Sequence, residues 1–544
     1  MRDHLPKLVI VGLMVLVVGV PFVMQYVAAD EQVDVAADAP RLIVISPHNE
    51  QIRFELEEGF NRWREAQGLD PVEFDWRAGG GTSDLRKQVL AQLESAAARG
   101  VEDQGLGADL FFGGGEYEHN ALAGGVTVTR GGERVDISAT VPPDLPQELI
   151  DNAFPEPTLG GEQLYHDELY WIGTTLASFG IVYNRDVLDM LGVPEPTTWE
   201  DLANPRLRGW IALADPSHSG SIAAAYHAII RRLGWNEGWN LLRRVFANAR
   251  YFASSSSKVP VDVSNGEAAI GMAIDFYGRY QAGAINNFAT GTRAKAAADD
   301  PGASPTSVSP SAEPRVGYID PIKVIDGKRT SMTAINADPI SLLRAAPHRE
   351  LAEQFIGWML TQDAQRLWQR RVGTPGGPIR FELRRQPIRR DLYTAEEKAY
   401  WTDPEIDPFA TAQPFPDAMP SFYSQVAPIA HAMAIDLHSD LTAAWNALQS
   451  TDPNAPAYNA MYERFFAMPE ALTIDWPDDE LAANWQAVIR DESHPRYDEV
   501  AQTLSGFKNA WRQRYPDDTA ELKARVAWTQ WFRDQYEAVV ELRR

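Results

Sequence analysis

The stretch WIALADPSHSGSIAAAYHAIIRRL, residues 210–233, contains the unit from which the fold can be predicted. Its first part, WIALADP, is a short apolar run typical of a buried strand, and IAAAYHAIIRRL places apolar residues at helical spacing. The polar turn DPSHSGS joins the two, with serines, a histidine and a glycine at the start of the helix. This stretch therefore predicts a strand, a turn and a helix in succession.

The same unit recurs earlier in the chain. Apolar strands at residues 41–45 and 72–77 each precede a polar turn, SPHN or AGGGTSD, and an amphipathic helix, and a strand within residues 108–116 ends in the glycines of FGGGE. Strands that alternate with helices at this spacing predict an α/β fold with a mostly parallel sheet. Because ligands bind outside the carboxyl ends of such strands, we expect the polar turns to converge on one edge.

The composition excludes several classes of function. The chain has 544 residues, 44% of them hydrophobic, which is enough for more than one core. Asp and Glu (75) outnumber Lys and Arg (50), so the formal net charge is -25 and no nucleic-acid partner is expected. The sequence has no cysteine, which excludes disulfides, thiol nucleophiles and a lipid-modified cysteine within it.

Residues 1–29 have the features of an export signal. Arg2 and Lys7 precede an apolar run over residues 8–26, and Ala28 and Ala29 follow it. The small residues predict a signal peptide cleaved near Ala29, whereas the length of the run also suits an uncut inner-membrane anchor. Both alternatives place the remainder in the periplasm or otherwise outside the cytoplasm, because the positive flank stays inside.

The turn DPSHSGS has the composition of an anion site. The first turn of a helix has unpaired N–H groups and carries a partial positive charge. Ser217, Ser219 and Ser221 offer hydroxyl donors, and Gly220 lets a ligand approach the backbone closely. The alternative is an ordinary helix cap within a polar loop.

The turn GGGTSD repeats this arrangement after another strand. Gly80 and Gly81 open the backbone, and Thr82 and Ser83 supply hydroxyls at the start of the next helix. Neither turn is a P-loop, because the sequence lacks the GxxxxGK[ST] pattern. Helix starts of this kind in separate lobes favour an anion held between them.

Longer stretches resemble a known family. ADPSHSGS at a helix start, FGIVYNRDVL, GEAAIGMAIDFYGRY and INADPISLLRAAPHRELAEQFIGWMLTQDAQRLW are similar to the extracellular solute-binding proteins of bacterial ABC importers, in the branch that binds ferric iron, thiamine and phosphorylated compounds. The resemblance covers roughly residues 41–378. It implies the type II periplasmic-binding-protein fold: α/β lobes joined by crossing hinge strands, with a solute trapped in the cleft and delivered to a permease.

The resemblance and the composition together divide the chain into units. They are lobe 1 over residues 41–176 with 315–345 returning to it, lobe 2 over 177–290 with 346–378, a flexible insert over 291–314, and a mainly α-helical C-terminal extension over 379–544. The insert is rich in Ala, Ser, Pro and Asp and has no periodicity.

The C-terminal extension lies outside the family pattern. It begins with a basic cluster that is more typical of internal ion pairs than of a docking patch: Arg384, Arg385, Arg389 and Arg390. Its tryptophans are expected in a core, and the alternative is a docking face for a partner.

The identity of the solute depends on residues 275–277. Iron-binding members of the family hold the metal with adjacent tyrosines, a histidine or carboxylate and a bound anion, whereas this chain has Asp275, Phe276 and Tyr277. Because phenylalanine cannot coordinate Fe(III), an organic anion is expected instead. Asp275 would accept its hydroxyl or amino donors, unless it is a buried, paired carboxylate, and Tyr277 would stack or hydrogen bond. The ferric-iron alternative would use His48, Glu116 and Tyr277.

The predicted ligand-binding residues share a position at the polar ends of strands. They are Ser46, His48, Asn49, Gly80, Gly81, Thr82, Ser83, Gly114, Glu116, Ser217, Ser219, Gly220, Ser221, Asp275 and Tyr277. His48 would hydrogen bond a solute oxygen, cap its own helix or bind metal. No cofactor is expected. The predicted partners are a small anionic solute bearing phosphate or carboxylate and an ABC permease of the inner membrane, and a monomer is expected.

Catalysis is not expected. The sequence contains neither GxSxG, nor HExxH, nor a GxGxxG that follows a strand, and its 10 histidines do not cluster at metal-ligand spacing. The remaining alternative is a membrane-anchored ligand sensor, in which an uncut anchor holds the lobes and the extension is a partner surface.

Overall fold

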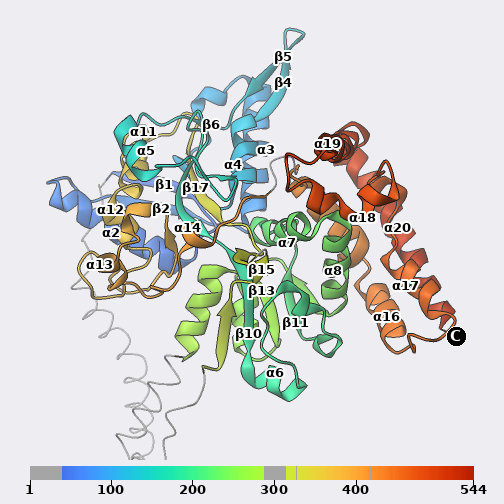
Figure 1. Cartoon of the computed structure of the whole chain (residues 1–544). Coiled ribbons are helices and arrows are strands. Elements are labelled where there is room, and N and C mark those ends of the chain that lie inside the picture. The colour runs from blue at the N-terminus through green and yellow to red at the C-terminus, as the bar shows by residue number, and fades with distance from the viewer. Residues whose placement is uncertain (1–39, 287–313, 326, 416–419, 517, 544) are drawn as a thin grey trace, which may run out of the picture.

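The computed structural model describes residues 40–286, 314–325, 327–415, 420–516 and 518–543. The predicted export segment, residues 1–29, lies outside these ranges, and so does the predicted insert, residues 291–314, except for its last residue. None of the described helices is long and apolar enough to cross a bilayer. The described residues form the predicted α/β lobes and a helical C-terminal extension (Figure 1).

The first lobe is built on a sheet with the strand order β18-β9-β17-β3-β1-β2, in which β6 also pairs with β17. The strands are β1 (Arg41–Ile45), β2 (Glu73–Arg77), β3 (Leu110–Phe112), β6 (Thr140–Val141), β9 (Ile172–Ala177), β17 (Asn336–Leu343) and β18 (Gln386–Pro387). β1 runs parallel to β2 and β3, as predicted, but β17 is antiparallel to β3 and β9. The expected mostly parallel sheet is therefore mixed, because β17 enters from the other lobe.

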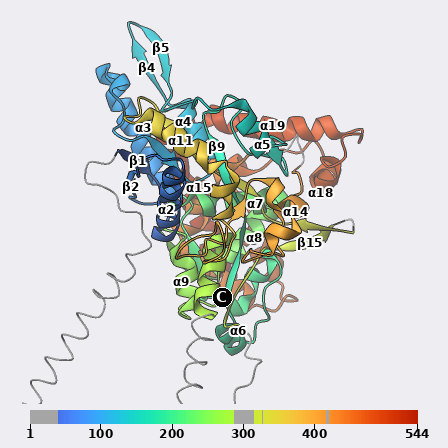
Figure 2. The same ribbon diagram turned by 90° about the vertical axis from the view of Figure 1, so that its left-hand side faces the viewer.

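Helices cover both faces of this sheet. Alternate residues of β1 face opposite cores: Leu42 and Val44 pack with Leu56 of α2, whereas Ile43 packs with Leu85 of α3. The helices of the lobe are α2 (Glu50–Ala66), α3 (Thr82–Arg99), α4 (Glu116–Gly124), α5 (Gln147–Ala153), α11 (Arg349–Met359) and α12 (Gln362–Arg366). A hairpin of β4 (Val126–Arg130) and β5 (Glu133–Ile137) projects from the lobe (Figure 2).

The placement of α11 and α12 corrects the sequence prediction, which assigned residues 346–378 to the second lobe. Phe355 of α11 lies in the core of the first lobe with Phe60 of α2, and their ring centroids are 5.1 Å apart. Leu367, just beyond α12, approaches Gly59 so closely that a Cβ there would lie 2.5 Å from its Cδ1. An amphipathic pattern identifies a helix, but it does not say which core receives the apolar face.

The second lobe has a sheet with the strand order β12-β11-β13-β10-β14. Its strands are β10 (Phe179–Asn184), β11 (Ile211–Ala214), β12 (Ala249–Ala253), β13 (Ile270–Ile274) and β14 (Val316–Ile319), and its helices include α6 (Arg185–Leu191), α7 (Gly220–Leu233), α8 (Trp235–Ala247) and α9 (Lys258–Ser264). β14 is a second correction, because residues 315–345 were expected to return to the first lobe, whereas Tyr318 pairs with Val182 of β10.

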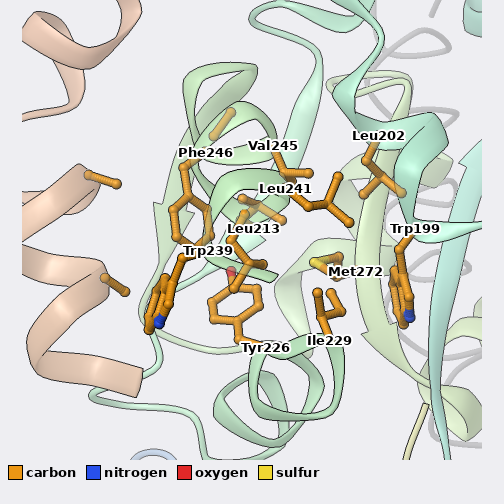
Figure 3. Close-up of a cluster of buried hydrophobic side chains, with 14 of the residues drawn as sticks. Trp199, Leu202, Leu213, Tyr226, Ile229, Trp239, Leu241, Val245, Phe246 and Met272 are labelled. Carbon is orange, nitrogen blue, oxygen red and sulfur yellow. The ribbon is translucent and has the colours of Figure 1, made fainter. Parts of the chain in front are cut away.

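The core of the second lobe lies between this sheet and α7 and α8. Tyr226 of α7 and Phe246 of α8 are buried with their ring centroids 5.1 Å apart, and Trp199 and Met272 belong to the same cluster (Figure 3). The chain passes between the lobes at Ser178, which separates β9 from β10, and again between β14 and β17. The two-lobed α/β fold predicted from the sequence is confirmed.

The C-terminal extension packs on both lobes in turn. Its first part, with β18, α13 (Ala395–Lys398) and α14 (Pro408–Thr411), lies on the first lobe. Its second part stacks along the α8 side of the second lobe (Figure 1) and comprises α15 (Tyr423–Ala430), α16 (His438–Gln449), α17 (Tyr458–Phe466), α18 (Asp479–Val488), α19 (Tyr497–Arg514) and α20 (Asp518–Leu542). Trp445, Trp485, Trp511 and Trp528 are buried in the same cluster as the second lobe, so the extension continues that core.

The basic cluster at the start of the extension forms internal contacts, as expected. Arg384 pairs with Asp403, Arg385 with Asp338, and Arg389 with Asp391. The guanidinium of Arg390 lies 5.8 Å from the ring centroid of Phe409.

Because the core is continuous, Tyr536→Ala in α20 should destabilise the second lobe together with the extension. Tyr536 is 1% exposed and donates a hydrogen bond to the carbonyl of Met433 at 2.8 Å. We expect a loss of about 3 kcal/mol in unfolding free energy, in a single transition of the joint unit. Urea unfolding followed by tryptophan fluorescence and circular dichroism measures it. Leu522→Ala on the same helix, where the side chain is 52% exposed, is the control and should have little effect. Early, separate unfolding of the extension would contradict the continuous core.

Candidate functional site

A cavity of about 520 Å³ lies between the lobes, and residues of both lobes and of the extension line it. α3, α4 and α7 all begin there, since their first residues, Thr82, Glu116 and Gly220, are part of the lining. α3 and α4 belong to the first lobe and α7 to the second. The polar turns after the strands therefore converge on one space.

Most of the predicted residues lie at this cavity. Those that line it are His48, Gly80, Gly81, Thr82, Gly114, Glu116, Ser219, Gly220, Ser221 and Tyr277. The predicted residues that do not line it are Ser46, Asn49, Ser83, Ser217 and Asp275. Each of the latter is engaged in a contact within the protein.

The polar residues of SPHN mainly hold their own turn. The hydroxyl oxygen of Ser46 accepts from the backbone N–H of His48 at 3.2 Å and lies 2.9 Å from its Nδ1. Asn49 is the N-cap of α2, where its Oδ1 accepts from the N–H of Ile52 at 3.1 Å. These residues therefore set the position of His48 at the cavity.

Ser217 and Ser83 have similar local partners. The hydroxyl of Ser217 donates to Oδ1 of Asp215 at 2.7 Å, and that of Ser83 donates to Oε1 of Glu118 at 3.3 Å. Both hydroxyls thus stabilise the turns beside the cavity.

Asp275 is the buried, paired carboxylate that the sequence left open as an alternative. It is fully buried, forms an ion pair of 3.1 Å with Arg279 and accepts from the N–H of Phe276 at 2.8 Å. Burial raises the pKa of Asp275 to about 6. The expectation that it accepts hydrogen bonds from the solute is therefore wrong, because its oxygens face Arg279 and the backbone.

The serines of DPSHSGS have different structural roles. Ser219 is the N-cap of α7, and its Oγ lies 3.5 Å from the N–H of Ile222. The hydroxyls of Ser219 and Ser221 are 3.1 Å apart, and Ser221 continues to Ser256 at 2.9 Å. This chain of hydroxyls lies on the cavity wall, so it can exchange hydrogen bonds with a polar guest.

The lobes touch directly at the mouth of the cavity. A Cβ on Gly81 of the first lobe would overlap the carbonyl oxygen of His218 in the second. Nδ1 of His218 lies 3.2 Å from Oδ2 of Asp84, and Lys87 donates to the carbonyl of Ser217 at 3.3 Å. The turns of the two lobes are therefore in direct contact.

A carboxylate of the protein already faces the start of α7. Glu118 is 1% exposed, and its Oε1 lies 2.6 Å from the position that a Cβ on Gly220 would take. The hydroxyl of Tyr423, from the extension, donates to Glu118 at 3.2 Å and lies 3.0 Å from the carbonyl of Gly220. Burial raises the pKa of Glu118. The side chain of Glu118 therefore already occupies the space in front of this helix start.

The far wall of the cavity is a buried charged network. Asp338 pairs with Nη1 of Arg385 at 2.5 Å and with Nε2 of His48 at 2.8 Å, and Arg385 is fully buried with its guanidinium 4.1 Å from the ring centroid of Phe276. Burial lowers the pKa of His48, although Asp338 opposes this, and burial raises the pKa of Tyr277 to about 12. His48 is therefore engaged by charged groups within the protein.

Several residues that line the cavity were not predicted from the sequence. Ser255, Ser256 and Ser257 follow β12 in the run SSSS, which is the same polar signal after a strand that identified the other turns. Arg231, Lys508 and Arg512 also line the cavity, and Arg231 pairs across the lobes with Glu162 at 2.5 Å. Lys508 and Arg512 carry no local signal, because only the fold of the extension brings them there.

The extension also holds the turn DPSHSGS through His431. Its Nε2 lies 3.0 Å from Oδ1 of Asp215, and its Nδ1 lies 2.9 Å from Asp436. Burial by itself raises the pKa of Asp215, but hydrogen bonds from His431 and Ser217 outweigh it and lower this pKa to about 2. For His431, burial lowers the pKa, but hydrogen bonds to Asp215 and Asp436 outweigh it and raise the pKa above the usual value.

Parts of the chain are similar to known proteins. Residues 143–316 match the family described as bacterial extracellular solute-binding protein. An uncharacterized protein of Haemophilus influenzae is 31% identical over 98 residues, which are 18% of this chain and only 28% of the length of that relative. Two solved structures are similar. The periplasmic binding protein AfuA from Actinobacillus pleuropneumoniae has 13% identity over 75% of this chain and 97% of that one, with a TM-score of 0.45. A ferric binding protein from Campylobacter jejuni has 16% identity over 74% and 98%, with a TM-score of 0.44.

His431→Asn should lower the free energy of unfolding by more at pH 6 than at pH 8.5, with a loss of about 1–2 kcal/mol at pH 6. The folded state favours protonated His431, so its contribution is complete below the usual histidine pKa of about 6.5 and is lost as pH rises through the raised pKa. Asp215 has the opposite pH dependence. Its contribution to the free energy of unfolding is lost as pH falls from about 4 through its lowered pKa. Urea unfolding at both pH values measures the difference, and an equal loss at the two values would contradict this assignment.

Proposed function

We propose that this chain, which carries a bacterial extracellular solute-binding domain over residues 143–316, captures a small organic anion outside the cytoplasm and delivers it to an ABC permease. The observation that carries the proposal is the cavity between the lobes, which is lined by helix starts from both lobes and by Lys508 and Arg512. Its volume of about 520 Å³ lies within the range of small-molecule sites, about 300–1,000 Å³.

The charges at the cavity support an anionic guest that also bears hydroxyl groups. The lining cations are Arg231, Arg385, Lys508 and Arg512, and the lining carboxyl groups are Glu116, Glu118, Glu162 and Asp338. Asp338 and Glu162 are neutralised by Arg385 and Arg231. Burial raises the pKa of Glu116 and of Glu118, which favours their neutral forms as hydrogen-bonding groups. Positive charge remains on Lys508 and Arg512.

The contacts between the lobes support capture by closure. A guest that touches both walls stabilises the closed form by its differential contacts, and this difference is what drives the lobes together. Release to a permease then requires the contacts between Gly81 and His218 and between Arg231 and Glu162 to separate. The hinge at Ser178 and the return through β17 would absorb that motion.

The polar residues at the start of α7 hold their own turn and its contact with the first lobe. The ring of His218 pairs with Asp84 of the other lobe, while the hydroxyl of Ser219 bonds Ser221 and caps its own helix.

Isothermal titration calorimetry with glycerol 3-phosphate, citrate, inorganic phosphate and the neutral analogue glycerol tests the proposal. We expect saturable binding of at least one of the anions at one site per chain and none of glycerol. Preference for the neutral compound, or an absence of binding by all the anions, would contradict an anion-binding function.

Gly81→Ala should hold the lobes apart and weaken solute binding by at least tenfold. The new Cβ would overlap the carbonyl oxygen of His218, while φ of -78° at residue 81 suits alanine, so the effect is confined to closure. Small-angle X-ray scattering should show a larger radius of gyration than in the parent protein. Gly79→Ala, with nothing within 4 Å of the added Cβ, is the matched control and should leave both properties unchanged. An unchanged radius and affinity in Gly81→Ala would refute the closure mechanism.

A further inference from the structure

Two cations of the C-terminal extension stand on the wall of the cavity. Lys508 and Arg512 lie four residues apart on α19, hence on one face of that helix, and both line the cavity with Arg231 of α7. α19 is outside the α/β lobes. The extension therefore reaches the site itself and does not only cover the second lobe.

The charge of this group is not balanced within the described part of the chain. Arg231 pairs with Glu162, but no carboxylate among the described residues forms an ion pair with Lys508 or Arg512. Burial and the neighbouring cations Arg512 and Arg231 lower the pKa of Lys508. Burial, Arg231 and Lys508 hold the pKa of His227 well below its usual value, so His227 adds no positive charge. An anion placed here would relieve the repulsion.

A further residue of the extension, Phe415 between α14 and α15, packs against the arginines at the end of α7. Phe415 lines the cavity, and its ring centroid lies 3.7 Å from the guanidinium of Arg231 and 3.9 Å from that of Arg232. Arg232 also donates to the carbonyl of Gln413 at 2.7 Å. These contacts hold the end of α7 against the extension.

α7 runs along the cavity and gives it two chemically different ends. Gly220, Ala224, His227 and Arg231 form its lining face, and the rise from residue 220 to residue 231 is about 16 Å. At the first end lie the hydroxyls of Ser219 and Ser221 and the carboxyl group of Glu118. At the other end lie the three cations.

We propose that Lys508, Arg512 and Arg231 hold the anionic group of the solute, so that the C-terminal extension supplies the anion subsite, while the hydroxyl-bearing end faces Ser219, Ser221 and Glu118. This orientation rests on the proposed function. It reverses the expectation that the start of α7 holds the anion, because Glu118 already lies there. Two guanidinium groups and an ammonium suit a phosphoryl group, which offers several charged oxygens to such donors.

Calorimetric titration with inorganic phosphate tests the subsite without the rest of the solute. The double variant Lys508→Gln with Arg512→Gln should bind phosphate at least tenfold more weakly than the parent protein. Arg514→Gln with Lys523→Gln changes the net charge equally on the extension but away from the cavity, so it should bind like the parent. The charge-preserving variant Lys508→Arg with Arg512→Lys should retain most of the affinity of the parent protein for phosphate. The variant Ser219→Ala with Ser221→Ala should change that affinity by less than threefold.

The outcomes separate this inference from the proposed function. Phosphate binding that survives the loss of Lys508 and Arg512, or that disappears with the two serines, would overturn the subsite while leaving an anion-binding protein. An equal loss in the control Arg514→Gln with Lys523→Gln would assign the effect to overall charge and also overturn it. A parent protein that binds neither phosphate nor the organic anions would contradict the proposed function and the subsite with it.

Discussion

The close approach of Gly81 to the carbonyl oxygen of His218 is the constraint on which the site depends. These atoms belong to turns of different lobes, and any side chain on Gly81 would separate them. Their contact closes the cavity and brings the starts of α3, α4 and α7 to one space.

The C-terminal extension is an integral part of the two-lobed structure. It shares a continuous core with the second lobe, pairs His431 with the Asp215 turn, and places Tyr423 against Glu118 and the first turn of α7. It also crosses from one lobe to the other, since β18 pairs with β9 of the first lobe. The extension is therefore packed against both lobes and against the turns that line the cavity.

Much of the fold could be predicted from the sequence because each strand, polar turn and helix carries its own local pattern. RLIVISPHN, VEFDWRAGGGTSD and WIALADPSHSGS all form the expected units, and their turns lie together because the carboxyl ends of strands share an edge. The lobes to which α11 and β14 belong could not be predicted in this way. Phe355 and Trp358 mark an apolar face equally suited to either core, and the pairing partner of Tyr318 lies 136 residues earlier, at Val182.

The site shows the same division between local and tertiary signals. Asp275 and Arg279 are four residues apart in a helix, a spacing that favours an ion pair, so its structural role was readable from the sequence. The run Ser254 to Ser257 repeats a signal that was recognised elsewhere. Glu118, Lys508 and Arg512 differ, because their positions at the cavity follow from packing across long separations in the chain.

The most direct measurement of the central claim is a crystal structure of the protein grown with an anionic solute that it binds. We predict density for one guest in the cavity, in contact with Ser219 or Ser221 of the second lobe, with the turn at Gly81 of the first and with Lys508 of the extension. A guest that lies on an outer surface, or that contacts one lobe alone in a protein whose cavity is empty, would contradict the claim.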